Sequence, residues 1–341
     1  MIGILDVLLI NPGTEMQQRG TWNREPPLGL LYIAAILEKD GFNCQIIDLS
    51  ITETPFLEIL ATIPVPRIIG FTALTNTYNH TLDIARNAKK FYQSESKVHP
   101  IFIIGGPHVT FTSEEVLNNE IFDFCFLGEI ESVITEFTSI ATSSSSLIEA
   151  KRKIRKFPRI LDQLAFKAHD GNMITSNAFR HLEIDLDMLP LPARHLLPIN
   201  DPGHFYNTAT VIVNRGCPNQ CIFCSRQALF KKARWRDPRG IMEELRAIHS
   251  MEYAYEYFNM YDNLTISLSF MDNLLDLMVN DDKVFLPWGC ELRADMVSKD
   301  IAKKLHIANC RATAVGIESA NDEILKTAGK FQSIDKVNNG L

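Results

Sequence analysis

The chain has 341 residues, 46% of them hydrophobic, which is enough to bury a large core and suggests two domains. Its net charge is −7 and its pI is about 5.8, a balance that does not favour binding to nucleic acid, and no run of about eighteen apolar residues indicates a membrane span. The first residues, MIGILDVLLINPG, lack the basic region and cleavage site of a signal peptide, so we expect a cytoplasmic protein.

Residues 1–140 alternate apolar runs with helical patterns, which is typical of a parallel α/β sheet. The candidate strands cover 6–12, 43–49, 67–73, 100–106 and 122–128. Between the first two, apolar residues recur at helical spacing, namely Leu30, Ile33, Ala34 and Leu37. We therefore predict a doubly wound, Rossmann-like domain over 1–145, which would bind ligands at the carboxyl ends of its strands.

A polar stretch at 138–150 interrupts this alternation. Beyond it, LAFKAHDGNMITS has the pattern of a hairpin with Asp170 and Gly171 at its turn. The next segment, IDLDMLPLPARHLLP, contains three prolines, which exclude a regular helix or a central strand. We interpret 146–203 as a connector between domains.

The alternation resumes in residues 204–341. A strand at 209–215 leads into a loop with three cysteines, and later strands are expected near 255–261, 284–292 and 311–319. Helices are expected near 238–250, 268–279, 298–307 and from Asn321 onward. The pattern predicts four βα units.

The seven cysteines divide into two groups. Four lie apart in apolar surroundings and are most simply core residues: Cys44, Cys125, Cys290 and Cys310. The other three, Cys217, Cys221 and Cys224, lie within eight positions directly after a strand, where barrel enzymes place their chemistry.

Two kinds of metal site fit these three thiols. A structural zinc ion needs four ligands, and Cys290 or His204 could supply the fourth. Alternatively, the thiolates hold three irons of a [4Fe–4S] cluster and leave the fourth iron open. In a reducing compartment a metal site is favoured over disulfides.

The spacing Cys217-x3-Cys221-x2-Cys224, with Phe223 before the last cysteine, resembles the signature of radical S-adenosylmethionine (SAM) enzymes. The resemblance implies that the open iron binds SAM and that an electron from a donor such as flavodoxin or ferredoxin cleaves it to a 5′-deoxyadenosyl radical. MYDNLT at 260–265 and GIESA at 316–320 resemble later motifs of the family. They imply that SAM also contacts Asp262, Gly316, Glu318 and Ser319.

The first half resembles a cobalamin-binding domain through LLINPG, IIGFTALT, IIGGPHVTFTSEEVL and FDFCFLGEIES. The implied contacts of cobalamin are Pro12, Gly13, Thr72, Thr75, Gly105, Gly106, Pro107, His108, Gly128, Glu129 and Glu131. Glycines lack a Cβ and so allow a close approach to the flat macrocycle. His108 is expected to pack near the corrin without binding cobalt, because the DxHxxG motif of histidine-ligating domains is absent from the sequence.

The resemblance thus implies a cobalamin-type domain followed by a radical SAM (β/α) barrel core. Such barrels usually have six βα units, so with about four the core is expected to be incomplete and the chain truncated. The function predicted is reductive cleavage of SAM, with cobalamin-dependent methyl transfer to an unactivated carbon of a small-molecule or peptide substrate. Two alternatives stay open: a truncated, non-catalytic remnant and a zinc-stabilised binding module.

Overall fold

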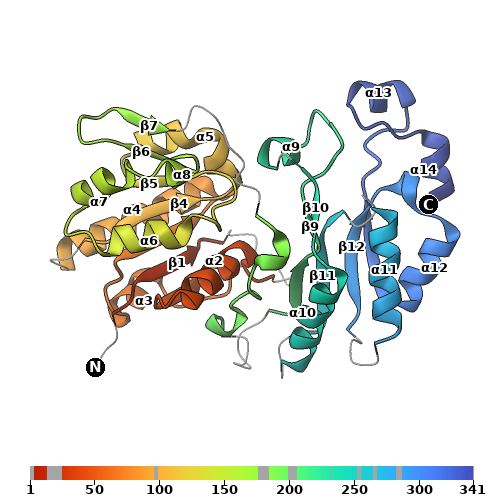
Figure 1. Cartoon of the computed structure of the whole chain (residues 1–341), viewed down its shortest axis with the longest axis horizontal. Helices are drawn as coiled ribbons and strands as arrows, with labels where there is room; N and C mark the ends of the chain where they lie inside the picture. The colour runs from red at the N-terminus through yellow and green to blue at the C-terminus, as the bar shows by residue number, and fades with distance from the viewer. Residues whose placement is uncertain are drawn as a thin grey trace. The chain divides into compact units, whose positions relative to one another are not determined.

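The computed structural model describes residues 4–13, 25–95, 99–175, 184–198, 206–230, 232–251, 255–263, 267–281 and 286–340 (Figure 1). These residues form two compact units. One lies within 4–198 and the other within 206–340, with the short segments 25–26 and 185–188 belonging to the second. In the part of the chain described, no helix has the length and apolar character needed to cross a bilayer.

The first unit is built on a seven-stranded sheet with the order β2-β1-β3-β4-β5-β6-β7. Its first five strands are parallel and fall inside the ranges expected from the sequence: β1 (Val7–Asn11), β2 (Cys44–Asp48), β3 (Ile68–Thr72), β4 (Ile101–Gly105) and β5 (Phe124–Phe126). The order reverses between β1 and β3, which is the switch point of a doubly wound sheet. The predicted fold of this half is confirmed.

Successive side chains of each strand enter two separate cores, because side chains alternate across a sheet. Leu8 and Ile10 lie in one core, and Val7 and Leu9 lie in the other. The first core is covered by α3 (Phe56–Thr62), α4 (Tyr78–Glu95) and α5 (Pro107–Asn118). The second is covered by α2 (Leu28–Lys39), α6 (Ile134–Thr142), α7 (Leu147–Ile154) and α8 (Pro158–Leu161). Both faces of the sheet are therefore buried, as parallel sheets require.

The predicted hairpin consists of β6 (Leu164–Lys167) and β7 (Met173–Thr175). The sequence placed it in the connector, but β6 pairs antiparallel with β5 and extends the first sheet. Leu164 and Phe166 are fully buried in the second core, and this burial fixes the hairpin there. The described parts of the proline-rich segment contain two short 3₁₀ turns, η1 (Leu186–Met188) and η2 (Arg194–Leu196).

The second unit contains a parallel sheet with the order β13-β12-β11-β8, so strands adjacent in the chain are adjacent in the sheet. The strands are β8 (Thr208–Ile212), β11 (Tyr257–Asn263), β12 (Trp288–Leu292) and β13 (Cys310–Val315). The helices are α10 (Pro238–Ser250), α11 (Leu268–Val279), α12 (Lys299–Ile307), α13 (Asp322–Thr327) and α14 (Ile334–Gly340), with a 3₁₀ turn η4 (Ala294–Met296). The four predicted βα units are confirmed.

The strand predicted at 209–215 is interrupted. After β8 the chain forms a separate short strand, β9 (Asn214–Arg215), which pairs antiparallel with β10 (Arg234–Trp235). This two-stranded ribbon closes the base of the cysteine loop, which also contains the short helix α9 (Arg226–Leu229).

Gly106 provides a test of the first unit. It precedes α5 with φ of 111°, and an added Cβ would lie 2.6 Å from the Ala73 carbonyl oxygen. We expect Gly106→Ala to lower the free energy of unfolding by about 1–3 kcal/mol. Urea denaturation followed by far-UV circular dichroism measures the change. Gly29→Ala is the matched control, because Gly29 lies in α2 with no atom within 4 Å of the added Cβ, and alanine there should stabilise by roughly 0.5–1 kcal/mol. An unchanged midpoint for Gly106→Ala would show that the close approach to Ala73 is not needed.

Candidate functional site

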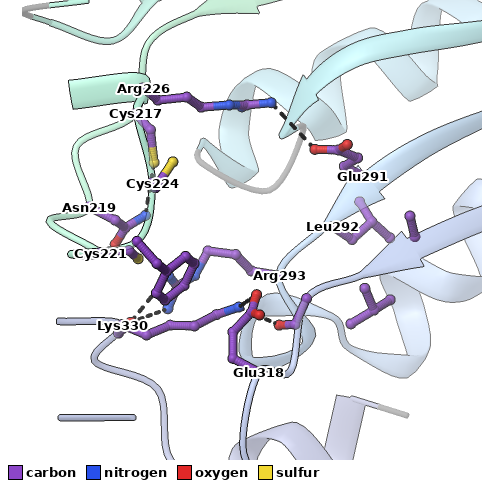
Figure 2. Close-up of a pocket in the computed structure, with 14 residues that line it drawn as sticks. Cys217, Asn219, Cys221, Cys224, Arg226, Glu291, Leu292, Arg293, Glu318 and Lys330 are labelled. Atoms are coloured by element: carbon purple, nitrogen blue, oxygen red, sulfur yellow. Dashed lines mark hydrogen bonds and ion pairs between the residues drawn. The ribbon is translucent and has the colours of Figure 1, made fainter. Parts of the chain in front are cut away.

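The three clustered cysteines lie on one wall of a pocket at the carboxyl end of the second sheet. The pocket has a volume of about 410 Å³. Its other walls come from the ends of β12 and β13 and from Lys330, as Figure 2 shows. The loop therefore faces the strand ends, which is where a parallel sheet collects its ligand-binding groups.

Burial separates these three cysteines from the other four. Cys217, Cys221 and Cys224 are half-buried, whereas the remaining cysteines are buried. Burial raises the pKa of Cys44 to about 12 and also raises the pKa of Cys125. Such thiols are inert core residues, as the sequence predicted.

Within the loop, local hydrogen bonds fix the cysteines. The Cys224 backbone N–H donates to the Cys221 carbonyl at 3.0 Å, and the Asn219 side-chain amide lies 3.2 Å from the Cys217 sulfur. Burial raises the pKa of the Cys221 thiol, while the positive charges of Lys330 and Arg293 act in the opposite direction. Nearby cations favour the thiolate form that binds metal.

The three clustered thiols lie on one wall of the pocket. A [4Fe–4S] cluster binds each cysteine thiolate through a separate iron. Three thiols on one wall can therefore supply three of the four iron ligands of such a cluster. Among the described residues, no group of three His, Cys, Asp or Glu side chains is placed to hold a single metal ion.

Charged side chains line the rest of the pocket in pairs (Figure 2). Lys330 lies 2.8 Å from the Glu318 carboxylate, and Arg226 lies 3.4 Å from that of Glu291. Arg293 pairs with Asp295 at 2.9 Å. The sequence signalled the cysteines, but it did not single out Arg226, Glu291, Arg293 or Lys330.

The residues predicted to contact SAM are only partly brought together. Phe223, Gly316 and Glu318 line the pocket. The Ser319 hydroxyl instead accepts a hydrogen bond from the Asn321 backbone N–H at 3.1 Å, at the start of α13. The backbone of Asp262 lies in β11, but its side chain lies outside the described part of the structure.

In the first unit, the residues predicted to contact cobalamin lie at the carboxyl ends of the parallel strands. Pro12 and Gly13 follow β1, Thr72 ends β3, Gly105 ends β4, and Gly128 follows β5. The remaining ones, Thr75, Gly106, Pro107, His108, Glu129 and Glu131, lie in the adjoining loops or at the start of α5. The topology therefore collects all of these positions at one edge of the sheet.

The contacts of Gly106 and His108 refine their expected roles. The Cβ that Gly106 lacks would collide with Ala73, so its absence is required by the protein backbone itself. The His108 ring packs against Tyr78 with centroids 4.2 Å apart, and its Nδ1 lies 3.3 Å from the Thr75 hydroxyl. Its Nε2 is buried and has no hydrogen-bond partner among the described residues.

Thr110 joins the loops after β4 and β5, and no sequence pattern singled it out. Its hydroxyl donates to the Gly106 carbonyl and accepts from the Gly128 backbone N–H, both at 3.0 Å. This bridge ties the loop after β4 to the loop after β5. The edge that would face a corrin is therefore fixed by hydrogen bonds within the protein.

Comparison with known proteins agrees with the two kinds of domain that the sequence predicted. The model of the B12 binding domain matches residues 23–138, and that of the radical SAM superfamily matches residues 211–341. An uncharacterized methyltransferase of Pyrococcus horikoshii is 29% identical over 98% of this chain and 71% of its own length. The anaerobic magnesium-protoporphyrin IX monomethyl ester cyclase of a Synechocystis species is 22% identical over 94% of this chain and 62% of its own length.

Among solved structures, the cobalamin-dependent SAM radical enzyme OxsB, with aqua-cobalamin and SAM bound, matches with a TM-score of 0.78 and 15% identity. The match covers 98% of this chain and 47% of OxsB, and at this identity it shows a shared fold. The order of the two matched domains agrees with the two units and with the predicted family. The chain therefore carries a B12-binding domain followed by a radical SAM domain, the combination that its sequence motifs predicted.

Proposed function

We propose that the chain is a cobalamin-dependent radical SAM enzyme that transfers a methyl group to a carbon of a small-molecule or peptide substrate. The observation that carries this proposal is the pocket that joins the three half-buried thiols to the ends of β12 and β13. A protein that binds no cofactor would have no reason to leave three thiols on the wall of a charged cavity.

The roles of the residues follow from their chemistry. Cys217, Cys221 and Cys224 hold the cluster, and Phe223, Gly316 and Glu318 contact SAM. When bound, the cluster supplies an electron for cleavage of SAM, and cobalamin supplies a carrier for the methyl group. The carboxylate of Glu318 can accept hydrogen bonds from ribose hydroxyls or from the ammonium group of SAM.

The first unit holds the cobalamin. The strand ends of β1, β3, β4 and β5 provide the surface, and Thr110 fixes two of its loops. Because the His108 ring packs against Tyr78 and Thr75, we infer that the lower cobalt face has no histidine ligand. The reaction also needs a one-electron donor, for which a flavodoxin or ferredoxin is suited.

Methyl transfer is favoured over other reactions because the relative from Pyrococcus horikoshii is named a methyltransferase. The cyclase from Synechocystis is the reason to test the product directly. A zinc-stabilised module is not favoured, because the Cys290 side chain is buried and does not line the pocket of the three clustered thiols. His204, the other proposed fourth ligand, lies outside the described residues. A non-catalytic remnant is not favoured either, since the paired charges of the pocket are in place.

Anaerobic reconstitution of the full chain with iron and sulfide should give roughly four irons and four sulfides per chain. Replacing Cys217, Cys221 and Cys224 together by alanine should abolish this content, because no thiolate remains in the pocket. Cys44→Ala is the control, since Cys44 is a buried residue of the first unit. Iron retained in full by the triple variant would contradict the assignment, and one zinc without sulfide would favour the binding module.

The reduced, reconstituted protein should convert SAM into 5′-deoxyadenosine, and with cobalamin and substrate also into S-adenosylhomocysteine. Mass spectrometry of both nucleosides separates the two reactions, because radical cleavage releases 5′-deoxyadenosine together with methionine, whereas methyl donation releases S-adenosylhomocysteine. The triple cysteine variant is the control and should release neither product above background. Production of 5′-deoxyadenosine without any S-adenosylhomocysteine would support radical cleavage but contradict methyl transfer.

Cobalamin bound to the full chain should lack a histidine ligand on cobalt. Electron paramagnetic resonance of the cob(II)alamin form should show no splitting from an axial nitrogen, and His108→Ala should leave the spectrum unchanged. Nitrogen splitting that disappears in His108→Ala would identify His108 as the ligand and contradict the inference from its packing.

A further inference from the structure

The turn formed by Ala328, Gly329 and Lys330 lies directly against the cysteine loop. The Ile222 backbone N–H, next to Cys221, donates to the Ala328 carbonyl at 3.0 Å. Gly329 has φ of 68°, and an added Cβ would lie 2.4 Å from the Gln220 carbonyl oxygen. The loop that holds the cysteines and the turn after α13 are thus in backbone contact.

The same turn buries the Lys330 side chain, which is 8% exposed. Its ammonium group donates to the Gly316 carbonyl at 2.7 Å and to the Glu318 carboxylate at 2.8 Å. The Lys330 carbonyl in turn accepts from the Arg293 guanidinium at 3.3 Å. Lys330 therefore joins the end of β13 to the end of β12, within a turn that also contacts the cysteine loop (Figure 2).

Glu318 has an unusual backbone conformation. Its φ is 67°, in the left-handed region that residues other than glycine rarely adopt. Such a conformation persists where its surroundings hold it, and it is common at ligand sites. The contacts of Lys330 with Gly316 and Glu318 hold the backbone and the side chain at this point. The Gln332 side-chain amide adds a third contact by donating to the Ile317 carbonyl at 3.0 Å.

We propose that Lys330 is a positioning residue for the SAM pocket. It fixes the Glu318 carboxylate at the pocket wall and brings a positive charge to the pocket that the Cys221 side chain also lines. This inference rests on the proposed function, because it assumes a cluster on the cysteines and SAM beside Glu318. Without Lys330, the Glu318 carboxylate would have lost its ion-pair partner while lying close to a negatively charged cluster. The left-handed backbone conformation of Glu318 would then relax.

The first experiment uses the reconstituted full chain and the variants Lys330→Met and Lys330→Arg. Iron content, the dissociation constant for SAM by anaerobic equilibrium dialysis, and the midpoint potential of the cluster are measured. Lys330→Met should keep its iron, bind SAM about tenfold to a hundredfold more weakly because a charge-assisted hydrogen bond is lost, and shift the potential to more negative values. Lys330→Arg should recover part of both losses. The matched control, Lys326→Met, removes an exposed lysine of α13 and should change neither quantity.

Wild-type SAM affinity and potential in Lys330→Met would overturn the proposal. Loss of iron in that variant would also overturn it, since Lys330 would then serve the loop and not the pocket. A wild-type chain that takes up iron but binds no SAM would refute the proposed function itself, which is a distinguishable result.

A second experiment asks whether Lys330 acts through Glu318. In a double-mutant cycle with Glu318→Gln, Lys330→Met should weaken SAM binding by a smaller factor than it does beside the native Glu318. Equal factors in both backgrounds would contradict positioning through Glu318. Gly329→Ala, one residue away, should behave differently and lose iron, because its Cβ would displace Gln220 in the cysteine loop.

Discussion

Parallel strands cannot be joined by a tight turn, because the chain must cross the sheet before the next strand begins at the same end. In the second unit this requirement brings the segments that follow β8, β12 and β13 to one edge, where the cysteines meet Arg293 and Glu318. In the first unit it brings Gly13, Thr72 and Gly106 to the corresponding edge. Residues far apart in the sequence become neighbours at both edges, while the buried sheets hold the loops in place.

The charged side chains around the pocket of the second unit are arranged in pairs. Lys330 is paired with Glu318, Arg226 with Glu291, and Arg293 with Asp295. A half-buried carboxylate or ammonium group without a partner would bear a large desolvation cost. Pairing lets the pocket hold many polar groups beside the thiols, and it also fixes the directions in which those groups point.

Much of the fold could be predicted, because buried parallel strands are continuous apolar runs and the helices carry apolar residues at helical spacing. The short ribbon of β9 and β10 could not be, since two-residue strands have no periodicity and depend on pairing across the cysteine loop. The place of β6 beside β5 was missed for a similar reason: both strands have local signals, but no local pattern shows that the two pair with each other.

The candidate site divides in the same way. The spacing of Cys217, Cys221 and Cys224 is local and can be seen in the sequence. The role of Lys330 depends on contacts with Gly316 and Glu318, which only the folded chain brings within hydrogen-bonding distance. Ser319 is the opposite case. It lies inside a recognisable motif, but its hydroxyl accepts a hydrogen bond at the start of α13.

The contact between Gly329 and Gln220 also sets an order of events during synthesis. The cysteine loop leaves the ribosome roughly a hundred residues before the turn that packs on it, which at ordinary translation rates is on the order of ten seconds. Throughout that interval the loop lacks the backbone contact that shapes one side of it. Only when α13 and its turn have folded can the Ile222 backbone N–H donate to the Ala328 carbonyl. The cysteine loop therefore reaches its final backbone contacts last, although it is made well before the turn that provides them.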